Sequence, residues 1–260
     1  MKVATWNVNG IRARHAQLVE WVARDRPDVI CLQEIKAAPE QIAEALTGLP
    51  DYWSYWHGAK GGYSGVSLHL RKAAFTETPR FSHPPFDAET RIVQAHVGTL
   101  TVASVYMPNG GKDYPAKLAF YGAMEGYVAD ALAGGGDVIV CGDLNVARTD
   151  DDVHPSQRKP NIIGQRPEER ALLERMIAPQ LVGQGAGGRL VDVARALEPD
   201  NTRLFTWWPY WRAARERNLG WRLDYVLVSE ALSKRAQACV VRTEIGTSDH
   251  APVLATFGEG

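Results

Sequence analysis

The sequence contains little cysteine, no long apolar run and no excess of charge of either sign. Its three cysteines, Cys31, Cys141 and Cys239, stand in separate apolar runs and predict buried, reduced thiols rather than a disulfide framework. No apolar run approaches the roughly 20 residues of a membrane span. A strand pattern begins directly after Met1, which leaves no room for a signal peptide. These absences predict a cytoplasmic protein that does not enter a membrane.

The charge balance argues against a protein that binds polyanions over its whole surface. The 260 residues carry a formal net charge of −1, with 45% hydrophobic and 23% charged residues, which is ordinary for a soluble globular protein. Any surface for nucleic acid must therefore be local. Residues 201–222 meet that condition, since they hold several arginines and a single acid, Glu216. The arginines are Arg203, Arg212, Arg215, Arg217 and Arg222.

Short apolar runs alternate with amphipathic segments along the chain. Buried strands are predicted at residues 2–6, 28–32, 65–70, 137–141, 224–228, 237–242 and 252–257, with a hairpin at 91–107 that turns near Gly98. Helices are predicted at residues 12–24, 39–46, 115–133 and 167–177, the last three each opened by a proline. Residues 183–188 predict a loop. Because no linker interrupts the pattern, we expect one layered α/β domain over residues 1–260.

Polar side chains follow several of these strands at the point where each ends. Asn7 and Asn9 follow the first, Glu34 follows the second, and Asp143 and Asn145 follow the fourth. Any one of them is explained about as well by a cap at a strand end, but together they indicate a convergent site. Carboxylate and amide oxygens suit Mg²⁺, and the sequence has no cysteine and histidine spacing that suits zinc.

Two further acids and a histidine complete the candidate set. Asp224 opens a predicted strand, and Asp249 stands beside His250 in "SDHAP". A lone histidine is more often structural than catalytic. An acid–histidine pair at the edge that holds the metal candidates is better explained as an imidazolium that meets a phosphate and is oriented by a carboxylate. We expect Asp249 to be that carboxylate.

Seven motifs, in this order, resemble the exonuclease III family of abasic-site endonucleases, within the endonuclease/exonuclease/phosphatase superfamily. They are "TWNVNGIRAR", "ICLQEIKAAPE", "GYSGVSL", "VYMPNGG", "CGDLN", "GWRLDYVLVS" and "SDHAP". The resemblance covers essentially the whole chain and implies a four-layer α/β sandwich, two packed mixed β-sheets flanked by helices. It implies Mg²⁺ or Mn²⁺ as cofactor and a monomer that acts on duplex DNA with abasic sites or damaged 3′ ends. The implied reactions are incision 5′ to the abasic site, 3′–5′ exonuclease activity and trimming of 3′ ends.

The resemblance also assigns roles to residues. Glu34 would be the principal metal ligand, with Asn7 and Asp249 as further ligands. Asp143 would orient or deprotonate the attacking water, which Asn145 fixes, and His250 would hold the scissile phosphate. The supporting positions are Tyr106, Asn109 and Asp224. Asn9 stands where related families carry Asp, which argues against a strong second metal site. The general base stays open between Asp143, His250 and a metal-bound hydroxide.

The segment "TWWPYWRAARERNLGWRLDY", residues 206–225, is the expected DNA-contacting element. In the family this segment lines a pocket for a sugar that has lost its base, and the matching positions are Trp207, Trp221 and Leu223. Trp211 would enter the duplex as a wedge, with Arg212 beside it on a surface ridge that continues to Arg215 and Arg217. Arg12, Tyr63 and Lys112 match positions that contact the DNA backbone or groove. The alternative is that the tryptophans fill the core, as we expect for Trp208.

Two other functions compete with DNA repair. A different phosphodiesterase of the superfamily, such as a general DNase, a lipid or inositol phosphatase or a poly(A) nuclease, would have no use for a pocket that fits a baseless sugar. A catalytically dead DNA-binding module would need a broken site, whereas every core position here carries a competent residue.

Overall fold

The computed structural model describes residues 1–42, 49–58, 61–177 and 189–259. Within these ranges the strands form two six-stranded mixed sheets. The first sheet has the order β11 (Ala236–Val241), β12 (Val253–Phe257), β1 (Lys2–Asn7), β2 (Val29–Gln33), β4 (Val66–Arg71) and β3 (Tyr52–His57). The second has the order β5 (Arg80–Ser82), β6 (Ile92–Val97), β7 (Leu100–Tyr106), β8 (Asp137–Asp143), β10 (Asp224–Val228) and β9 (Val191–Asp192).

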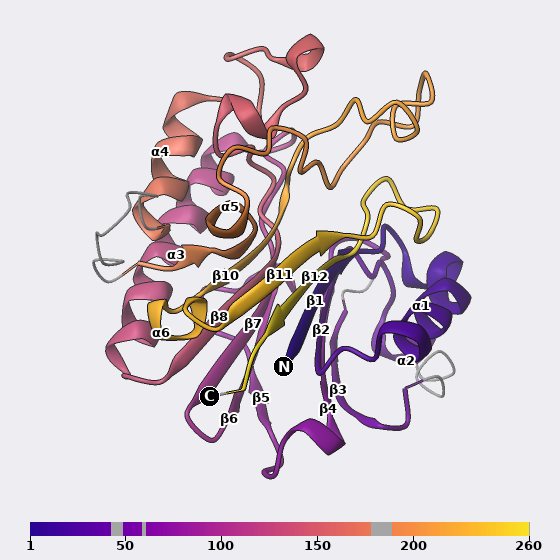
Figure 1. The fold of residues 1–260 in the computed structure, drawn as a ribbon, viewed down its shortest axis with the longest axis vertical. Helices are drawn as coiled ribbons and strands as arrows, with labels where there is room; N and C mark the ends of the chain where they lie inside the picture. Colours follow the sequence, from indigo (N-terminus) through magenta and orange to yellow (C-terminus); the bar gives the residue numbers. More distant parts are fainter. Residues whose placement is uncertain (43–48, 59–60, 178–188, 260) are drawn as a thin grey trace.

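Helices cover the outer faces of both sheets (Figure 1). On one side lie α1 (Ile11–Asp25) and the short α2 (Pro39–Ile42); on the other lie α3 (Tyr114–Ala133) and α4 (Pro167–Met176). Shorter helices are α5 (Val193–Leu197) and α6 (Glu230–Ser233), with 3₁₀ turns η2 (Lys72–Ala74), η3 (Asp150–Asp152) and η4 (Pro155–Gln157). The predicted four-layer sandwich is confirmed.

Three apolar layers hold the sandwich together. The central layer lies between the sheets, where inward side chains such as Val29, Cys31, Ile139 and Cys141 are fully buried. Further layers join the first sheet to α1 and the second sheet to α3 and α4. Strands buried on both faces read as continuous apolar runs, which is why β2 and β8 were predictable from the sequence. All three cysteines are buried and free, as predicted.

Local signals set the ends of the longest helix. Asp113 caps α3 by accepting a hydrogen bond from the backbone N–H of Ala116 (2.9 Å), and Pro115 occupies its first turn. The helix ends at Ala133, as predicted, and Gly134 is its C-cap. The predicted helix at 39–46 is described only as far as Ile42, and residues 43–46 and 183–188 lie outside the described ranges.

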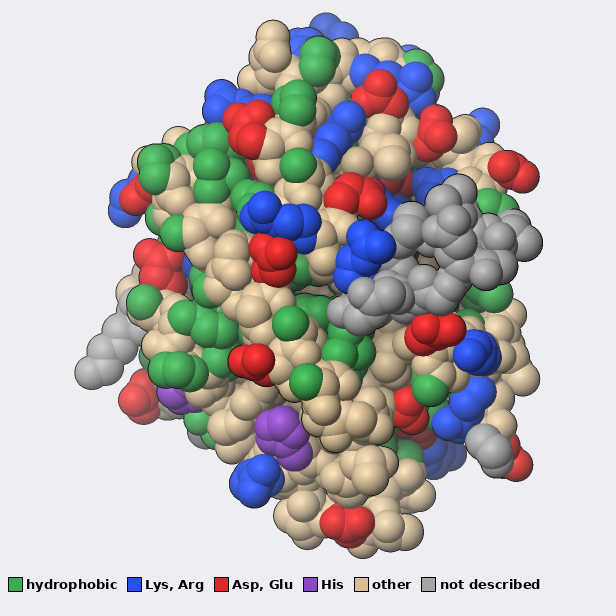
Figure 2. Space-filling model, turned by 90° about the vertical axis from the view of Figure 1, so that its left-hand side faces the viewer, with side chains coloured by type: hydrophobic (Ala, Val, Ile, Leu, Met, Phe, Trp, Pro, Cys, Tyr) green, Lys and Arg blue, Asp and Glu red, His purple; other side chains and the backbone are tan. Residues whose placement is uncertain are grey.

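The sequence did not predict β3, β5 and β9. β3 is an edge strand with mostly half-buried side chains, and its aromatic and polar residues give no continuous apolar run. β5 and β9 are three and two residues long, too short for a periodic pattern. None of the helices in the described ranges has the length and apolarity needed to span a bilayer. On the face covered by α3 and α4, acidic and basic side chains are interspersed (Figure 2).

Candidate active site

The polar strand ends from both sheets meet at one edge of the sandwich. β1 and β2 are parallel with Asn7 opposite Gln33, so Asn7 and Glu34 leave the first sheet side by side. β10 runs antiparallel to β8 with Asp224 opposite Asp143, so the start of one strand meets the end of the other. The side-chain amide of Asn7 joins the two sheets, donating hydrogen bonds to Glu34 (2.8 Å) and Asp143 (2.9 Å).

Three residues of this edge have left-handed backbone conformations. The φ angles are 45° at Asn9, 50° at Glu34 and 53° at Asn145. Such angles are uncommon outside glycine and persist only where the surrounding structure enforces them, often at functional sites. At Asn145 two hydrogen bonds enforce this conformation. Its backbone N–H donates to the Asp143 carboxylate (2.9 Å), and its side-chain amide donates to the carbonyl of Met107 (2.9 Å). The turn therefore aims the Asn145 side chain back over Asp143.

The acid that orients His250 is Asp224. Nδ1 of His250 lies 2.8 Å from Oδ2 of Asp224, while Nε2 faces Asp143 at 3.8 Å. The expected pairing with Asp249 is wrong. The Asp249 carboxylate instead accepts hydrogen bonds from Asn9 (2.9 Å) and from the indole of Trp207 (3.1 Å). Asp249 lies in a bend and only His250 takes part in a β-bridge, so adjacency in the chain does not bring these two side chains together.

Burial and charge give the central groups unusual proton affinities. Burial, reinforced by Asp224 and Glu34 and opposed by His250, raises the pKa of Asp143 to about 7. Burial alone would lower the pKa of His250, but Asp224 and Asp143 outweigh it and raise this pKa to about 10. At neutral pH His250 is therefore an imidazolium, and Asp143 is poised close to its own titration.

Among the described residues, a group of three potential ligands lies at this edge: Glu34, Asp143 and His250. Their ligand atoms all lie within 4.8 Å of one another. Burial would raise the pKa of Glu34, but hydrogen bonds from Asn7 and Lys36 hold it below its ordinary value. A second oxygen of Glu34 contacts the Lys36 ammonium (2.6 Å). A carboxylate held in its ionised form suits a hard divalent cation. Glu34 therefore fits a metal ion as an oxygen donor, with Asp143 and His250 beside it.

Two residues predicted as metal ligands have other partners. Asn7 turns its amino group towards both carboxylates, and its side-chain oxygen accepts the backbone N–H of Asn9 (3.0 Å). Asp249 lies outside the group of Glu34, Asp143 and His250. In this structure Asn7 positions the carboxylates, and Asp249 braces Asn9 and Trp207.

Tyr106 and Asn109 adjoin the same carboxylates. Burial, then the charges of Glu34 and Asp143, raises the pKa of Tyr106 far above its ordinary value, so the phenol stays a neutral hydrogen-bond donor. The side-chain amide of Asn109 donates to the Asn145 side chain (3.2 Å).

Residues 206–225 build a wall directly against the catalytic edge. Trp207 forms isolated β-bridges with both Trp221 and His250. The two indoles meet edge to face, 5.5 Å between centroids and 72° between planes. Trp207 and Trp221 are half-buried and Leu223 is buried, and the backbone bridge of Trp207 places this segment beside His250. Trp208 is core, as predicted.

The expected arginine ridge is only partly present. Trp211 is 52% exposed, and Arg212 packs over its ring at 5.3 Å. Arg215 instead turns inward and donates to the carbonyls of Thr243, Ile245 and Ser248. Arg222 is fully buried and binds Asp152 and Asp192. The expectation that these two arginines belong to a DNA-contacting surface is therefore wrong, because both guanidiniums are hydrogen-bonded to groups within the protein.

The remaining predicted contacts flank the edge. Arg12 and Lys112 are exposed, and Tyr63 is 54% exposed. The hydroxyl of Tyr63 accepts a hydrogen bond from Arg91 (2.7 Å), and the guanidinium of Arg91 also packs over the rings of Tyr63 and Tyr106. Arg91 was not predicted, because a single arginine at the start of a strand carries no sequence signal.

Two other site residues escaped prediction. Lys36 bridges Glu34 and Asn9, and the hydroxyl of Tyr210 accepts hydrogen bonds from Asn9 (3.3 Å) and from the backbone of Asp249 (3.1 Å). The position of Lys36, two residues after a candidate ligand, was the one available hint.

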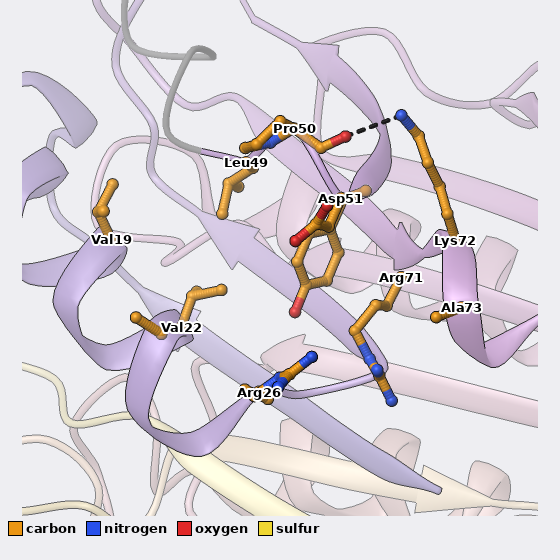
Figure 3. Close-up of a pocket in the computed structure, with 11 residues that line it drawn as sticks. Val19, Val22, Arg26, Leu49, Pro50, Asp51, Arg71, Lys72 and Ala73 are labelled. Carbon is orange, nitrogen blue, oxygen red and sulfur yellow. Dashed lines mark hydrogen bonds between the residues drawn. The ribbon is translucent and has the colours of Figure 1, made fainter.

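A cavity of about 620 Å³ lies elsewhere on the first sheet (Figure 3). It is bounded by α1, by residues 49–52 and by Arg71 and Lys72 at the end of β4. Arg71 pairs with Asp28 at the start of β2, so this cavity is at the opposite end of that strand from Glu34. It takes no part in the site described here.

The endonuclease/exonuclease/phosphatase family model matches residues 4–250. Recombination repair protein 1 of Drosophila melanogaster is 33% identical over 99% of this chain, which spans 37% of that relative's length. DNA repair nuclease APEX1 of Danio rerio is 32% identical, covering 97% of this chain and 81% of its own. The exodeoxyribonuclease of Bacillus subtilis is 32% identical, covering 97% of this chain and 98% of its own.

Solved structures agree over the full length. An AP endonuclease from Archaeoglobus fulgidus superimposes with a TM-score of 0.84 and 28% identity, covering 99% of each chain. A 3′ phosphatase from Neisseria, bound to a product DNA hairpin, superimposes with a TM-score of 0.85 and 28% identity, covering 100% of each chain.

Proposed function

Because the chain belongs to the endonuclease/exonuclease/phosphatase family, we propose that it is a metal-dependent DNA repair nuclease that cuts duplex DNA 5′ to abasic sites. The relatives named as repair nucleases and exodeoxyribonuclease support hydrolysis of DNA phosphodiesters. We extend the proposal to 3′–5′ exonuclease activity and to trimming of damaged 3′ ends. The similarity to a 3′ phosphatase supports the trimming of 3′ ends.

The observation that carries abasic selectivity is the double bridge of Trp207 to His250 and to Trp221. The bridges hold Trp207 beside the imidazolium that would bind the phosphate, and we propose that Trp207, Trp221 and Leu223 wall an apolar recess there. A deoxyribose without a base is small and has an apolar face, whereas an intact nucleotide brings a base that the two indoles exclude. Extruding a nucleotide also costs least where no base stacks or pairs.

Within the site, each residue has a role that its environment supports. Asp143, with a pKa of about 7, accepts the proton of the attacking water, which Asn145 helps to orient. His250 is already protonated, so it does not act as the base but binds the phosphate and the charge that develops there. The neutral phenol of Tyr106 and the amide of Asn109 donate hydrogen bonds to the same oxygens. Fixed donors aimed at developing charge are usually the largest contribution to catalysis.

Glu34 would be the principal ligand of the metal ion, which we propose to be Mg²⁺ or Mn²⁺. When bound, the ion would neutralise part of the phosphate charge. Asn7 keeps both carboxylates in place, and Asp224 keeps His250 oriented. Exposed Arg12, Tyr63, Lys112, Trp211 and Arg212 would engage the DNA backbone and groove, contacts that position a duplex without reading its sequence.

The test is incubation with duplexes that carry one abasic analogue, with and without EDTA, beside the matched intact duplex. We expect a single cut 5′ to the analogue that EDTA abolishes. Equal cleavage of the intact duplex would favour a general DNase instead. No cleavage of either duplex with Mg²⁺ or with Mn²⁺ would favour a DNA-binding module. We further propose that the protein acts as a cytoplasmic monomer. Sedimentation of the free protein tests the oligomeric state.

A further inference from the structure

Two histidines and an acid converge outside the catalytic group, where the outermost strands of the two sheets face each other. His57 is the last residue of β3, an edge strand of the first sheet. His83 directly follows β5, an edge strand of the second sheet, and Asp87 lies four residues further on. Their ligand atoms all lie within 4.8 Å of one another. The imidazoles of His57 and His83 stack with centroids 4.4 Å apart and 13° between planes.

The chain between His83 and Asp87 is rigid. Its sequence is His-Pro-Pro-Phe-Asp, and the backbone N–H of Asp87 donates to the carbonyl of Pro84 (3.0 Å), closing a turn. Two prolines with restricted φ hold that turn before any ligand binds. One carboxylate oxygen of Asp87 accepts the backbone N–H of Arg91 (2.8 Å), and the other contacts Nε2 of His57 (2.6 Å). His57 and Asp87 are thus fixed, while His83 is exposed.

We propose that His57, His83 and Asp87 form a second metal site, for a transition-metal cation of the Zn²⁺ class, that joins β3 to the turn after β5. Two imidazoles and one carboxylate are donors that Zn²⁺ prefers, whereas the carboxylates at Glu34 and Asp143 suit a harder ion. Zinc–ligand bonds of about 2.0–2.2 Å set tetrahedral donors roughly 3.3 Å apart. Ligand atoms up to 4.8 Å apart need to close by about 1.5 Å at most, through rotation of the exposed His83, and the His57–Asp87 contact of 2.6 Å opens by about 0.7 Å. Water completes the coordination.

The bound metal would brace the approach to the active site without entering its chemistry. Asp87 holds the backbone of Arg91, and the guanidinium of Arg91 donates to Tyr63 and packs on Tyr106. Fixing the turn therefore fixes the arginine that supports both tyrosines. Because the three ligands come from both sheets, an unfolded chain does not assemble them, and binding stabilises the folded state.

The experiment measures zinc bound per chain and thermal unfolding in the Glu34→Ala background, which weakens binding at the catalytic edge. We expect one zinc ion bound per chain, and we expect His83→Ala and His57→Asn each to abolish this binding. The Tm should rise with zinc concentration only in protein that keeps all three ligands. Cobalt should give the visible absorption of a tetrahedral site in the parent and lose it in His83→Ala. The matched control is His96→Ala on β6, whose ring contacts Thr101 and lies outside the group.

His83 is exposed, so its replacement leaves the EDTA-treated protein with an unchanged Tm, which separates loss of a ligand from loss of the fold. Zinc that remains at the same stoichiometry and affinity in His83→Ala sits elsewhere, and the proposal fails. The proposal also fails if the Glu34→Ala parent binds no zinc, or if Mg²⁺ raises Tm as much as zinc does at equal concentration. Neither result bears on the abasic-site activity, which is assayed separately.

Discussion

The imidazole of His250 is held by Asp224, a residue 26 positions away in the chain, and not by its neighbour Asp249. The contact joins the last segment before β12 to the start of β10, and so links the two sheets directly behind the catalytic edge. It gives His250 a positive charge at neutral pH and leaves Nε2 free to face Asp143.

Asp224→Asn should lower the pKa of His250 strongly from its value of about 10, because burial disfavours the imidazolium once its main counter-charge is gone. In the wild type the pKa of His250 in the folded protein lies above its unfolded value of about 6.5. The stabilisation from the His250–Asp224 pair is therefore fully present below about pH 6.5 and is lost as the pH rises towards 10. Titration of the His250 ring by NMR in metal-free protein checks this. Asp249→Asn is the control and should shift the pKa much less.

Glu34→Ala should remove most of the Mg²⁺ affinity and the activity while leaving the fold, because this carboxylate follows the strand and contacts polar partners rather than the apolar core. Calorimetric titration with Mg²⁺ and turnover of an abasic duplex at low Mg²⁺ measure the two effects. Unchanged turnover under those conditions would contradict the assignment of Glu34 as the principal ligand.

Trp207→Ala should blur discrimination between abasic and intact duplexes more than it lowers turnover, because it removes one of the two indoles that exclude a base. Trp211→Ala should instead weaken binding, by roughly 1–3 kcal/mol if the exposed ring stacks on a base. Cleavage of matched abasic and intact duplexes separates the two. Wild-type preference in both Trp207→Ala and Trp221→Ala would place selectivity outside the recess.

Arg212→Ala should reduce the salt dependence of duplex binding by a slope of up to about one, because its exposed guanidinium is available to a phosphate. Arg215→Ala should leave the slope unchanged and lower stability, since its guanidinium is bound to three backbone carbonyls. Binding across a salt series, beside thermal unfolding, distinguishes them. A slope change in Arg215→Ala would mean that the arginine turns outward when DNA binds.

Asp152→Asn should destabilise the fold by about 3–5 kcal/mol, because it leaves Arg222 and Arg195 buried without a main partner. Burial would raise the pKa of Asp152, but these two arginines lower it to about 2. The stabilisation it gives is therefore present above the unfolded pKa of about 3.9 and is lost as the pH falls through 2. Denaturant unfolding between pH 5 and 2 should show a weaker pH dependence in the variant.

The sequence by itself determined the layered α/β architecture and the chemical character of the site. Continuous apolar runs give strands buried on both faces, and the polar residues that end them, such as Glu34 and Asp143, must emerge at a sheet edge. Features that depend on residue type and local spacing were readable, including the start of α3 near Pro115 and the burial of Cys31 and Cys141.

Only the tertiary structure decided which polar groups pair. His250 takes Asp224, whereas the bend at Asp249 directs its carboxylate towards Asn9 and Trp207. Arg215 and Arg222 belong to a basic stretch in the sequence but are bound inside the fold, since a buried guanidinium must find acceptors wherever the packing offers them. Hydrogen bonds and ion pairs are set by distances of a few ångströms between segments far apart in the chain, and one-dimensional spacing does not encode those distances.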